Sequence, residues 1–525
     1  MTNISTEEIE LHIRTYRSRL KSTGKVKISQ LIDTHLGMNS ILHEKGKGNK
    51  IDIAAFIYVL LRLPPCMSKV KHIILGQSYS VFRNHGFLKL SDWREVDSPG
   101  RRRKMYFDGN DTLTVYIASV TDLDDLITLF TAFQIEWNKF HGKDADKILD
   151  LDDLTKIKNI WGKDYHKFLT AINHKTIDFT VTLLAGSYVE YAKATQHWWN
   201  HIESQLKSLN IPERPTYFVS SNTHSIVNLL TKYALSSSNK LIDYLYGSKN
   251  SFLINLWEEI KTGKSPYHKD YFLYYIAKKY AKTYKDFEGQ KLNFAKSMGI
   301  HQIPAHHYLD IDVQVIELNK LNDEKLKKSE AIIINIDYPL GWAAYQVLTE
   351  IGQNVDSVRG IYIMGKAATL NGAIGDILIP ETVFDQHTKN VYAITNVFNS
   401  SDLKDIFKTG SVLDKQKTVC VKGTFFENQK TVEAWFKEGY TIIEMETGPY
   451  LNSAYEYVYY NRYTENQFIA LTNSPYDLGI LHYASDTPYS KARNMGVRNL
   501  SYEGVEATYA CTRAILNKIF EKEKF

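Results

Sequence analysis

Apolar residues recur at helical spacing through most of the first ~205 residues. The spacing predicts helices over 7–42 and 51–63, the second ended by Pro64 and Pro65. The β-branched run 112–120 predicts a strand, followed by a helix with Thr121 as its N-cap. We therefore expect a mainly helical N-terminal domain over residues 1–205.

The pattern changes near residue 210, where short, wholly apolar runs begin to alternate with helical segments. Strands that are apolar throughout are typical of a sheet covered on both faces. We expect an α/β domain over 210–525, with a twisted mixed sheet flanked by helices and a helical insertion at about 240–298. The expected strands are 217–221, 313–318, 331–336, 360–364, 376–379, 418–421, 441–445 and 468–472, and 502–522 is the expected last helix.

Composition limits the classes of function. The chain has 525 residues, too many for one ordinary core, and a net charge of +5, which suggests an anionic ligand at most and no nucleic-acid partner. Its 3 cysteines form no CxxC pair and predict neither disulfides nor a zinc site. We expect no signal peptide, no contact with a membrane and a cytoplasmic protein.

Four polar segments follow predicted strands, where α/β sheets bind their ligands. The turn Asn222-Thr223-His224 precedes a helix and could present backbone N–H groups to an anion. The others are the glycine-flanked segment Gly365 to Asp376, Glu444-Met445-Glu446-Thr447, and Ser485-Asp486-Thr487-Pro488. The last three each have a structural explanation: a tight connection for the glycines, helix capping for the two glutamates, and a turn for Asp486.

The order of these motifs resembles the purine nucleoside phosphorylase superfamily, whose nucleosidase members carry a methionine-glutamate strand end and a later serine-aspartate motif. Within it, the chain is most similar to AMP nucleosidases, over almost its whole length. The resemblance implies that Glu446 binds the ribose hydroxyls, with Met445 beneath the sugar. It implies that Asp486, beside Ser485, protonates the purine at N7, and that Phe426 stacks on the base. No cofactor and no metal are implied.

The chemistry agrees with these roles. Cleaving a purine N-glycoside develops positive charge on the ribose, and a carboxylate can accept from both hydroxyls of a diol. The purine leaves well only when it is protonated, and an aspartate donates that proton near neutral pH only if desolvation raises its pKa.

The sequence departs from the resemblance at the glycine turn, where Ala368 and Thr369 replace glycines. Phosphorolytic members place an arginine just before that turn, and here the first cation is Lys366. We therefore expect hydrolysis by water, most simply of AMP to adenine and ribose 5-phosphate. A phosphorylase, a hydrolase of another purine nucleoside or nucleotide, and an inactive nucleotide sensor stay open. Candidates for binding a nucleotide phosphate are Lys366, His224, Lys491, Arg493 and Arg498.

Two further clusters have open or structural explanations. The run Arg101 to Lys104 is either a solvated loop or a contact for a phosphate or nucleotide effector. His306 and His307 with Asp310 and Asp312 match no standard ligand spacing, so we predict no metal site there. By analogy with the superfamily we expect a homo-oligomer.

Overall fold

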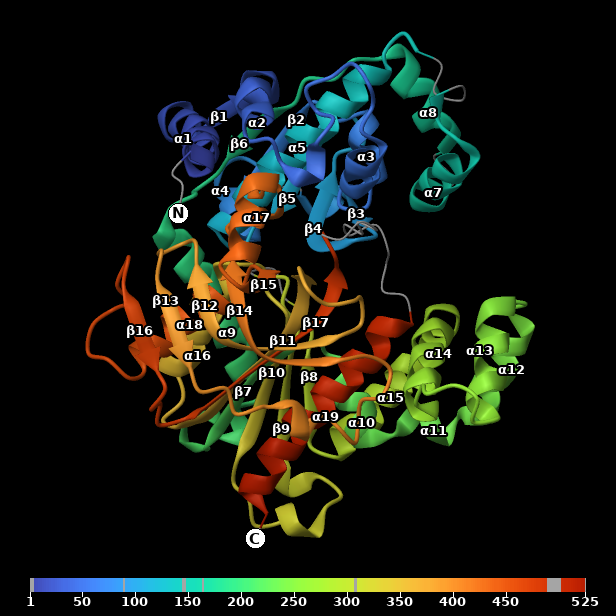
Figure 1. The fold of residues 1–525 in the computed structure, drawn as a ribbon, viewed down its shortest axis with the longest axis vertical. Coiled ribbons are helices and arrows are strands. Elements are labelled where there is room, and N and C mark those ends of the chain that lie inside the picture. The colour runs from blue at the N-terminus through green and yellow to red at the C-terminus, as the bar shows by residue number, and fades with distance from the viewer. Residues whose placement is uncertain are drawn as a thin grey trace.

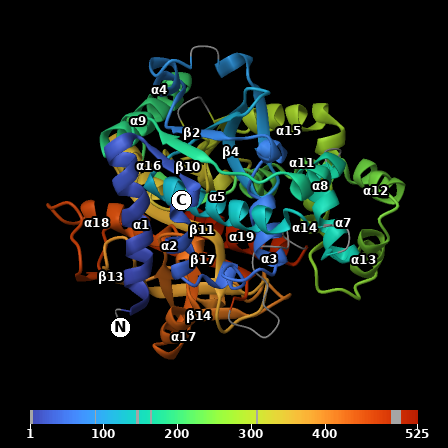
Figure 2. The same ribbon diagram turned by 90° about the horizontal axis from the view of Figure 1, so that it is seen from above.

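The computed structural model describes residues 4–87, 90–143, 148–162, 165–305, 309–488 and 502–524. Two β-sheets lie one above the other, the smaller built from the N-terminal part of the chain and the larger from the rest (Figure 1). Helices of an insertion project to one side of the larger sheet. Seen from above, the N-terminal elements lie over β11 and β17 of the larger sheet (Figure 2).

The smaller sheet has six strands in the order β1-β6-β2-β5-β4-β3. The longest helix described in the N-terminal part is α5, which spans Val120–Phe140 and is buried along almost its whole length. The strands are β1 (Lys25–Lys27), β2 (His72–Gly76), β3 (Arg94–Ser98), β4 (Arg101–Phe107), β5 (Thr112–Tyr116) and β6 (Thr180–Leu183). The other helices are α1 (Ile4–Thr23), α2 (Ile32–Gly37), α3 (Ile53–Leu60), α4 (Tyr79–Asn84), α7 (Leu151–Trp161) and α8 (Tyr165–His174).

Helices make up most of the regular structure of this part, as expected, but the sheet was only partly foreseen. The expected helix over 7–42 ends at Thr23, because Gly24 adopts a φ of +67° and β1 follows. The N-cap of α5 is Ser119, whose side chain accepts from the backbone N–H of Thr121, so the expected cap at Thr121 was wrong.

The larger sheet has eleven strands in the order β16-β13-β12-β14-β15-β11-β7-β10-β9-β8, with β17 paired to β11 and β12. It mixes parallel and antiparallel pairs, which confirms the predicted α/β class. The strands are β7 (Thr216–Ser221), β8 (Ile300–Ile303), β9 (Val313–Glu317), β10 (Ile332–Asp337), β11 (Val358–Thr369), β12 (Ile377–Asp385), β13 (Val391–Ile394), β14 (Val412–Cys420), β15 (Tyr440–Glu444), β16 (Phe468–Leu471) and β17 (Asp477–Asp486).

Hydrophobic cores cover both faces of this sheet. Phe218 of β7 faces a core with α9, α16 and α18, whereas Tyr217 and Val219 face a core with α10 and α19. Helix α9 lies in the part that we assigned to the N-terminal domain. It packs against α16 in the core that Phe218 faces. These helices are α9 (Tyr188–Gln205), α10 (Ser225–Thr231), α16 (Ala343–Gln353), α17 (Gln429–Lys437), α18 (Thr447–Glu456) and α19 (Glu503–Glu523).

The insertion is helical, as its sequence predicted. It consists of α11 (Tyr233–Ser236), α12 (Ser238–Gly247), α13 (Ser251–Lys261), α14 (Lys269–Thr283) and α15 (Lys285–Ser297). Helix α14 packs against α19, which ties the insertion to the sheet. Among the described helices, none has the length and apolar character needed to cross a membrane.

Two strands differ from the prediction in a way that matters for the site. The expected turn at Gly365 is instead the interior of β11, which pairs with β17 beyond that residue. The turn comes later, at Gly375, where φ is +93°. The second difference is β17, which was not expected and which ends at Asp486. Asp486 therefore lies at a strand end and not in a free loop.

Candidate active site

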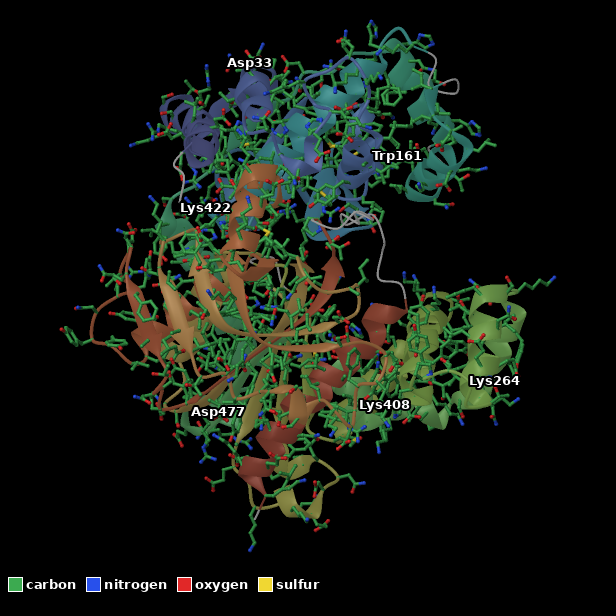
Figure 3. The ribbon with its side chains drawn as sticks, in the orientation of Figure 1. Asp33, Trp161, Lys264, Lys408, Lys422 and Asp477 are labelled. Atoms are coloured by element: carbon green, nitrogen blue, oxygen red, sulfur yellow. The ribbon has the colours of Figure 1, made fainter. Side chains whose placement is uncertain are left out.

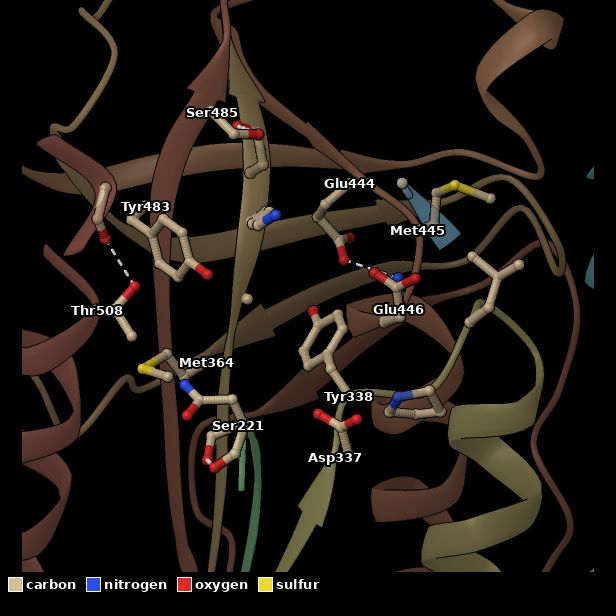
Figure 4. A pocket seen from close by; sticks show the side chains of 18 of the residues that line it. Ser221, Asp337, Tyr338, Met364, Glu444, Met445, Glu446, Tyr483, Ser485 and Thr508 are labelled. Atoms are coloured by element: carbon tan, nitrogen blue, oxygen red, sulfur yellow. Dashed lines mark hydrogen bonds between the residues drawn. The ribbon is translucent and has the colours of Figure 1, made fainter. Parts of the chain in front are cut away.

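A cavity of about 810 Å³ lies between the two sheets, at the ends of β7, β10, β11, β15 and β17. Residues of the N-terminal part, of α14 and of the start of α19 close its other sides. Side chains from several elements line it (Figure 4), among them Glu444, Met445, Glu446, Tyr338, Tyr483 and Ser485. A mostly preformed cleft with a few convergent polar groups is the usual form of a small-molecule site.

The register of the sheet brings the two predicted carboxylate motifs together. Ala368 of β11 pairs with Asp486 of β17 on one side and with Ile443 of β15 on the other. Glu444 and Asp486 consequently flank the same stretch of β11. Carboxylates from segments about forty positions apart thus share one cavity.

Glu444 is buried and holds the start of α18. One of its oxygens, Oε2, accepts from the backbone N–H groups of Glu446 and Thr447, both at 2.8 Å. Its other oxygen, Oε1, has no hydrogen-bond partner among the described residues. Burial raises the pKa of Glu444 to about 7 against the opposing effect of the two N–H groups. The capping explanation therefore holds for Glu444.

Glu446 is also buried, with 6% of its surface exposed. Its Oε1 accepts from the backbone N–H of Gly341 at 3.1 Å. The next residue, Trp342, donates its backbone N–H to Thr121 Oγ1 of the N-terminal part at 2.9 Å. The carboxylate at the predicted ribose position is thus fixed by a loop that also contacts the N-terminal part.

Ser485 and Asp486 lie across β11 from the two glutamates. The Ser485 hydroxyl donates to Asp486 Oδ2 at 2.7 Å, and both residues are half-buried. Partial exposure leaves the Asp486 carboxyl accessible from the cavity, where a ligand would complete its burial.

Tyr338 lies beside Glu444 and Glu446 in the cavity wall, and its hydroxyl is buried (Figure 4). Its hydroxyl has no hydrogen-bond partner among the described residues. Burial, together with the charges of Glu446 and Glu444, holds the pKa of Tyr338 well above its usual value, so the hydroxyl stays protonated. A Cβ at Gly365 would lie 2.2 Å from this hydroxyl, so glycine is required there by close approach.

The turn after β7 contributes Asn222 and His224 to the cavity. Asn222 Oδ1 accepts from the backbone N–H groups of His224 at 3.1 Å and Ser225 at 2.7 Å, which fixes the turn. Thr223 does not line the cavity, and its carbonyl accepts from Gln314 Nε2 at 2.6 Å.

Cations enter the cavity from two directions. Lys366 comes from β11, and α14 contributes Lys278, Lys279 and Lys282. Arg103 is the arginine among the described residues that line the cavity. Its guanidinium is buried and forms ion pairs with Asp122 and Asp125, each at 2.8 Å. The solvated-loop interpretation of the basic run is wrong for Arg103, because it lies in β4 and faces inward.

The cavity unites most of the predicted site residues. These are Asn222, His224, Gly365, Lys366, Glu444, Met445, Glu446, Ser485 and Asp486. Phe426 is not among the lining residues, because its side chain is 2% exposed and packs into the core of the N-terminal part. Arg493, Lys491, Arg498, His306 and His307 lie outside the described residues. Among the described residues, no group of three or more His, Cys, Asp or Glu side chains is placed to hold a metal ion.

Sequence reasoning did not single out Tyr338, Glu427 or the lysines of α14. Tyr338 directly follows β10, so the rule that ligands bind beyond strand ends would have found it. Glu427 directly follows Phe426, which was expected to stack on the base. The position of α14 depends on how the insertion folds back, which its local pattern does not indicate.

Several solved structures are weakly similar to this one. A 5′-methylthioadenosine/S-adenosylhomocysteine nucleosidase from Neisseria meningitidis is 10% identical, with a TM-score of 0.33 over 58% of this chain and 99% of that chain. A futalosine hydrolase mutant from Helicobacter pylori is 8% identical, with a TM-score of 0.32 over 58% and 99%. A uridine phosphorylase from Schistosoma mansoni is 9% identical, with a TM-score of 0.33 over 61% and 91%.

No curated protein sequence matches the chain. One family model does, over residues 28–149 and 146–521, which together span most of the sequence. The chain therefore belongs to the family of unknown function DUF6909.

Proposed function

We propose that the protein is a purine nucleotide N-ribosidase that hydrolyses AMP to adenine and ribose 5-phosphate. The observation that carries the proposal is the convergence of two carboxylate motifs on one cavity, Glu444 and Glu446 on one side of β11 and Asp486 on the other. This is the arrangement that the resemblance to nucleosidases implies for a sugar-binding and a proton-donating carboxyl.

In this proposal Glu446 holds the ribose. Its Oε1 accepts from the backbone N–H of Gly341, and carboxylate oxygens are acceptors of the kind that the two ribose hydroxyls require. A buried carboxylate also stabilises the positive charge that develops on the sugar as the glycosidic bond lengthens. Met445, on the same wall, would contact the sugar.

Asp486 then gives a proton to N7 of the purine, and Ser485 orients its carboxyl through the 2.7 Å hydrogen bond. The electrons of the C1′–N9 bond pass into the protonated base, and water supplies the oxygen that bonds to C1′. Hydrolysis is favoured over phosphorolysis because the arginine among the described lining residues, Arg103, is engaged by Asp122 and Asp125.

The lysines of the cavity favour a nucleotide over a nucleoside. Carboxylates gather at the ends of β15 and β17, whereas Lys278, Lys279 and Lys282 form a separate cationic wall on α14. A ligand with a neutral sugar and a phosphate at one end matches this division of charge.

The test is a panel of AMP, ATP, adenosine and inosine, each incubated with the protein with and without inorganic phosphate, and free base followed by chromatography. We expect base release from AMP without phosphate. Release only with phosphate would make the protein a phosphorylase, and binding without release would make it a sensor.

A further inference from the structure

One titratable group in the cavity is not used by the mechanism above. Glu427 lines the cavity with only 7% of its surface exposed. Its carboxyl makes no hydrogen bond with any described residue. A buried carboxyl without such a partner is costly unless it is neutral or serves a ligand.

The backbone of Glu427 is held by the N-terminal part of the chain. Its carbonyl accepts from the backbone N–H of Ile41 at 2.8 Å, and the next residue, Asn428, forms an isolated antiparallel bridge with Ser40. On the other side, the Tyr58 hydroxyl donates to Thr424 Oγ1 at 3.1 Å. The segment is therefore clamped at both ends.

The side chains before Glu427 strengthen this clamp. Phe425 and Phe426 are both buried in the core of the N-terminal part, and the Phe425 ring meets the Tyr58 ring edge-on at 5.7 Å. Lys422 forms an ion pair with Glu10 of α1 at 3.0 Å, at the junction of the two parts (Figure 3). Glu427 enters the cavity on a segment whose position the N-terminal part determines.

Asp486 is the charged neighbour that acts on Glu427. Burial, and secondarily the negative charge of Asp486, raises the pKa of Glu427 to about 8. Lys366 and Glu444 line the same cavity, but neither is a source of this change. At neutral pH Glu427 therefore holds a proton beside the negative charge of Asp486.

We propose that Glu427 is the proton-holding partner of Asp486, positioned by the N-terminal part of the chain, so that the two carboxyls together supply the proton that the leaving base requires. This inference rests on the proposed function for its chemistry. It assigns the N-terminal part a direct role in the reaction, because that part holds one member of the pair.

The step balances in protons and electrons. Glu427 passes its proton to the Asp486 carboxylate, directly or through water, and Asp486 gives it to N7 as the C1′–N9 bond breaks and the electron pair of that bond enters the base. The attacking water bonds to C1′ through oxygen and releases one proton, which restores Glu427. The net change is nucleotide plus water to base plus sugar phosphate.

The test compares Glu427→Gln with Glu506→Gln. Glu506 is a second buried carboxyl whose pKa burial raises to about 7, but it does not line the cavity. For Glu427→Gln we expect the alkaline limb of the kcat/KM profile to move to lower pH by about one unit or more, with a roughly tenfold loss of kcat/KM at pH 7.5. We expect Glu506→Gln to leave that limb in place.

A second measurement does not depend on activity. Difference infrared spectra of wild type minus Glu427→Gln at pH 7 should contain the band of one protonated carboxyl. Superimposable pH profiles, or the absence of that band, would overturn the inference. If the wild type releases no base from any substrate, the proposed function fails, and the infrared band still decides whether Glu427 holds a proton.

Discussion

The two carboxylate pairs of the cavity differ in how they are held. Glu444 and Glu446 belong to one short segment, and backbone N–H groups of Glu446, Thr447 and Gly341 bind their oxygens. Glu427 and Asp486 come from distant segments. The hydrogen bond described for their carboxyls is the one that the Ser485 hydroxyl donates to Asp486. The first pair is held in a fixed position, whereas we propose that the second pair exchanges a proton.

The largest expected effect comes from breaking the second pair at Asp486. Asp486→Asn removes the proton donor with little change of volume, so we expect kcat to fall by about 10²- to 10⁴-fold while nucleotide binding is nearly unchanged. Steady-state kinetics and calorimetric titration with AMP measure the two quantities. A wild-type rate in this variant would make Asp486 a structural strand-end residue.

Breaking the first pair should have a different signature. Glu446→Gln weakens a charge-assisted contact with the ribose in both the ground state and the transition state. We expect kcat to fall and KM to rise, with a combined loss in kcat/KM of about 10- to 100-fold. Unchanged values of both constants would remove Glu446 from the sugar site.

A substitution at Gly365, in β11, tests how tightly the cavity wall is packed at Tyr338. A Cβ there would lie 2.2 Å from the Tyr338 hydroxyl, so Gly365→Ala must displace a tyrosine whose hydroxyl is buried. We expect a loss of roughly 1–3 kcal/mol in unfolding free energy, together with a higher KM, measured by denaturant titration and kinetics.

Gly289→Ala in α15 is the matched control, because nothing lies within 4 Å of the added Cβ. That variant should gain roughly 0.5–1 kcal/mol, since alanine favours the helix. Equal unfolding free energies for the two variants would mean that Tyr338 moves aside without loss of stability.

A further effect is expected on stability as pH changes. The folded-state pKa of Glu427 is raised from 4.5 to about 8, so the folded chain holds a proton there that the unfolded chain has lost. Its contribution to stability is fully present below pH 4.5 and is lost as pH rises through about 8. Glu427→Gln should flatten the decline of unfolding free energy over this range by up to about 1.4 kcal/mol per pH unit. Parallel curves for both proteins would contradict the raised pKa.

The first pair could be predicted from the sequence because its features are local. An apolar run followed by Glu444-Met445-Glu446 indicates a strand end, and the helix after it needs a cap. The α/β class and the helical insertion followed from hydrophobic spacing in the same way.

The second pair could be predicted only in part. Asp486 was named from its motif, but β17 was missed, so its place at a strand end was unknown. Glu427 depends on contacts with Ile41, Ser40 and Tyr58, several hundred residues away in sequence. Phe426 was expected over the base, and the same contacts bury it in the N-terminal core. No local pattern indicates such tertiary contacts.

Hydrolytic cleavage of AMP is tested most directly by the release of adenine in phosphate-free buffer, followed over time for the wild type and Asp486→Asn side by side. We predict that the wild type forms adenine and ribose 5-phosphate in equal amounts and that Asp486→Asn forms neither at a comparable rate. No release by the wild type, or release that requires phosphate, would contradict the assignment of a hydrolytic N-ribosidase.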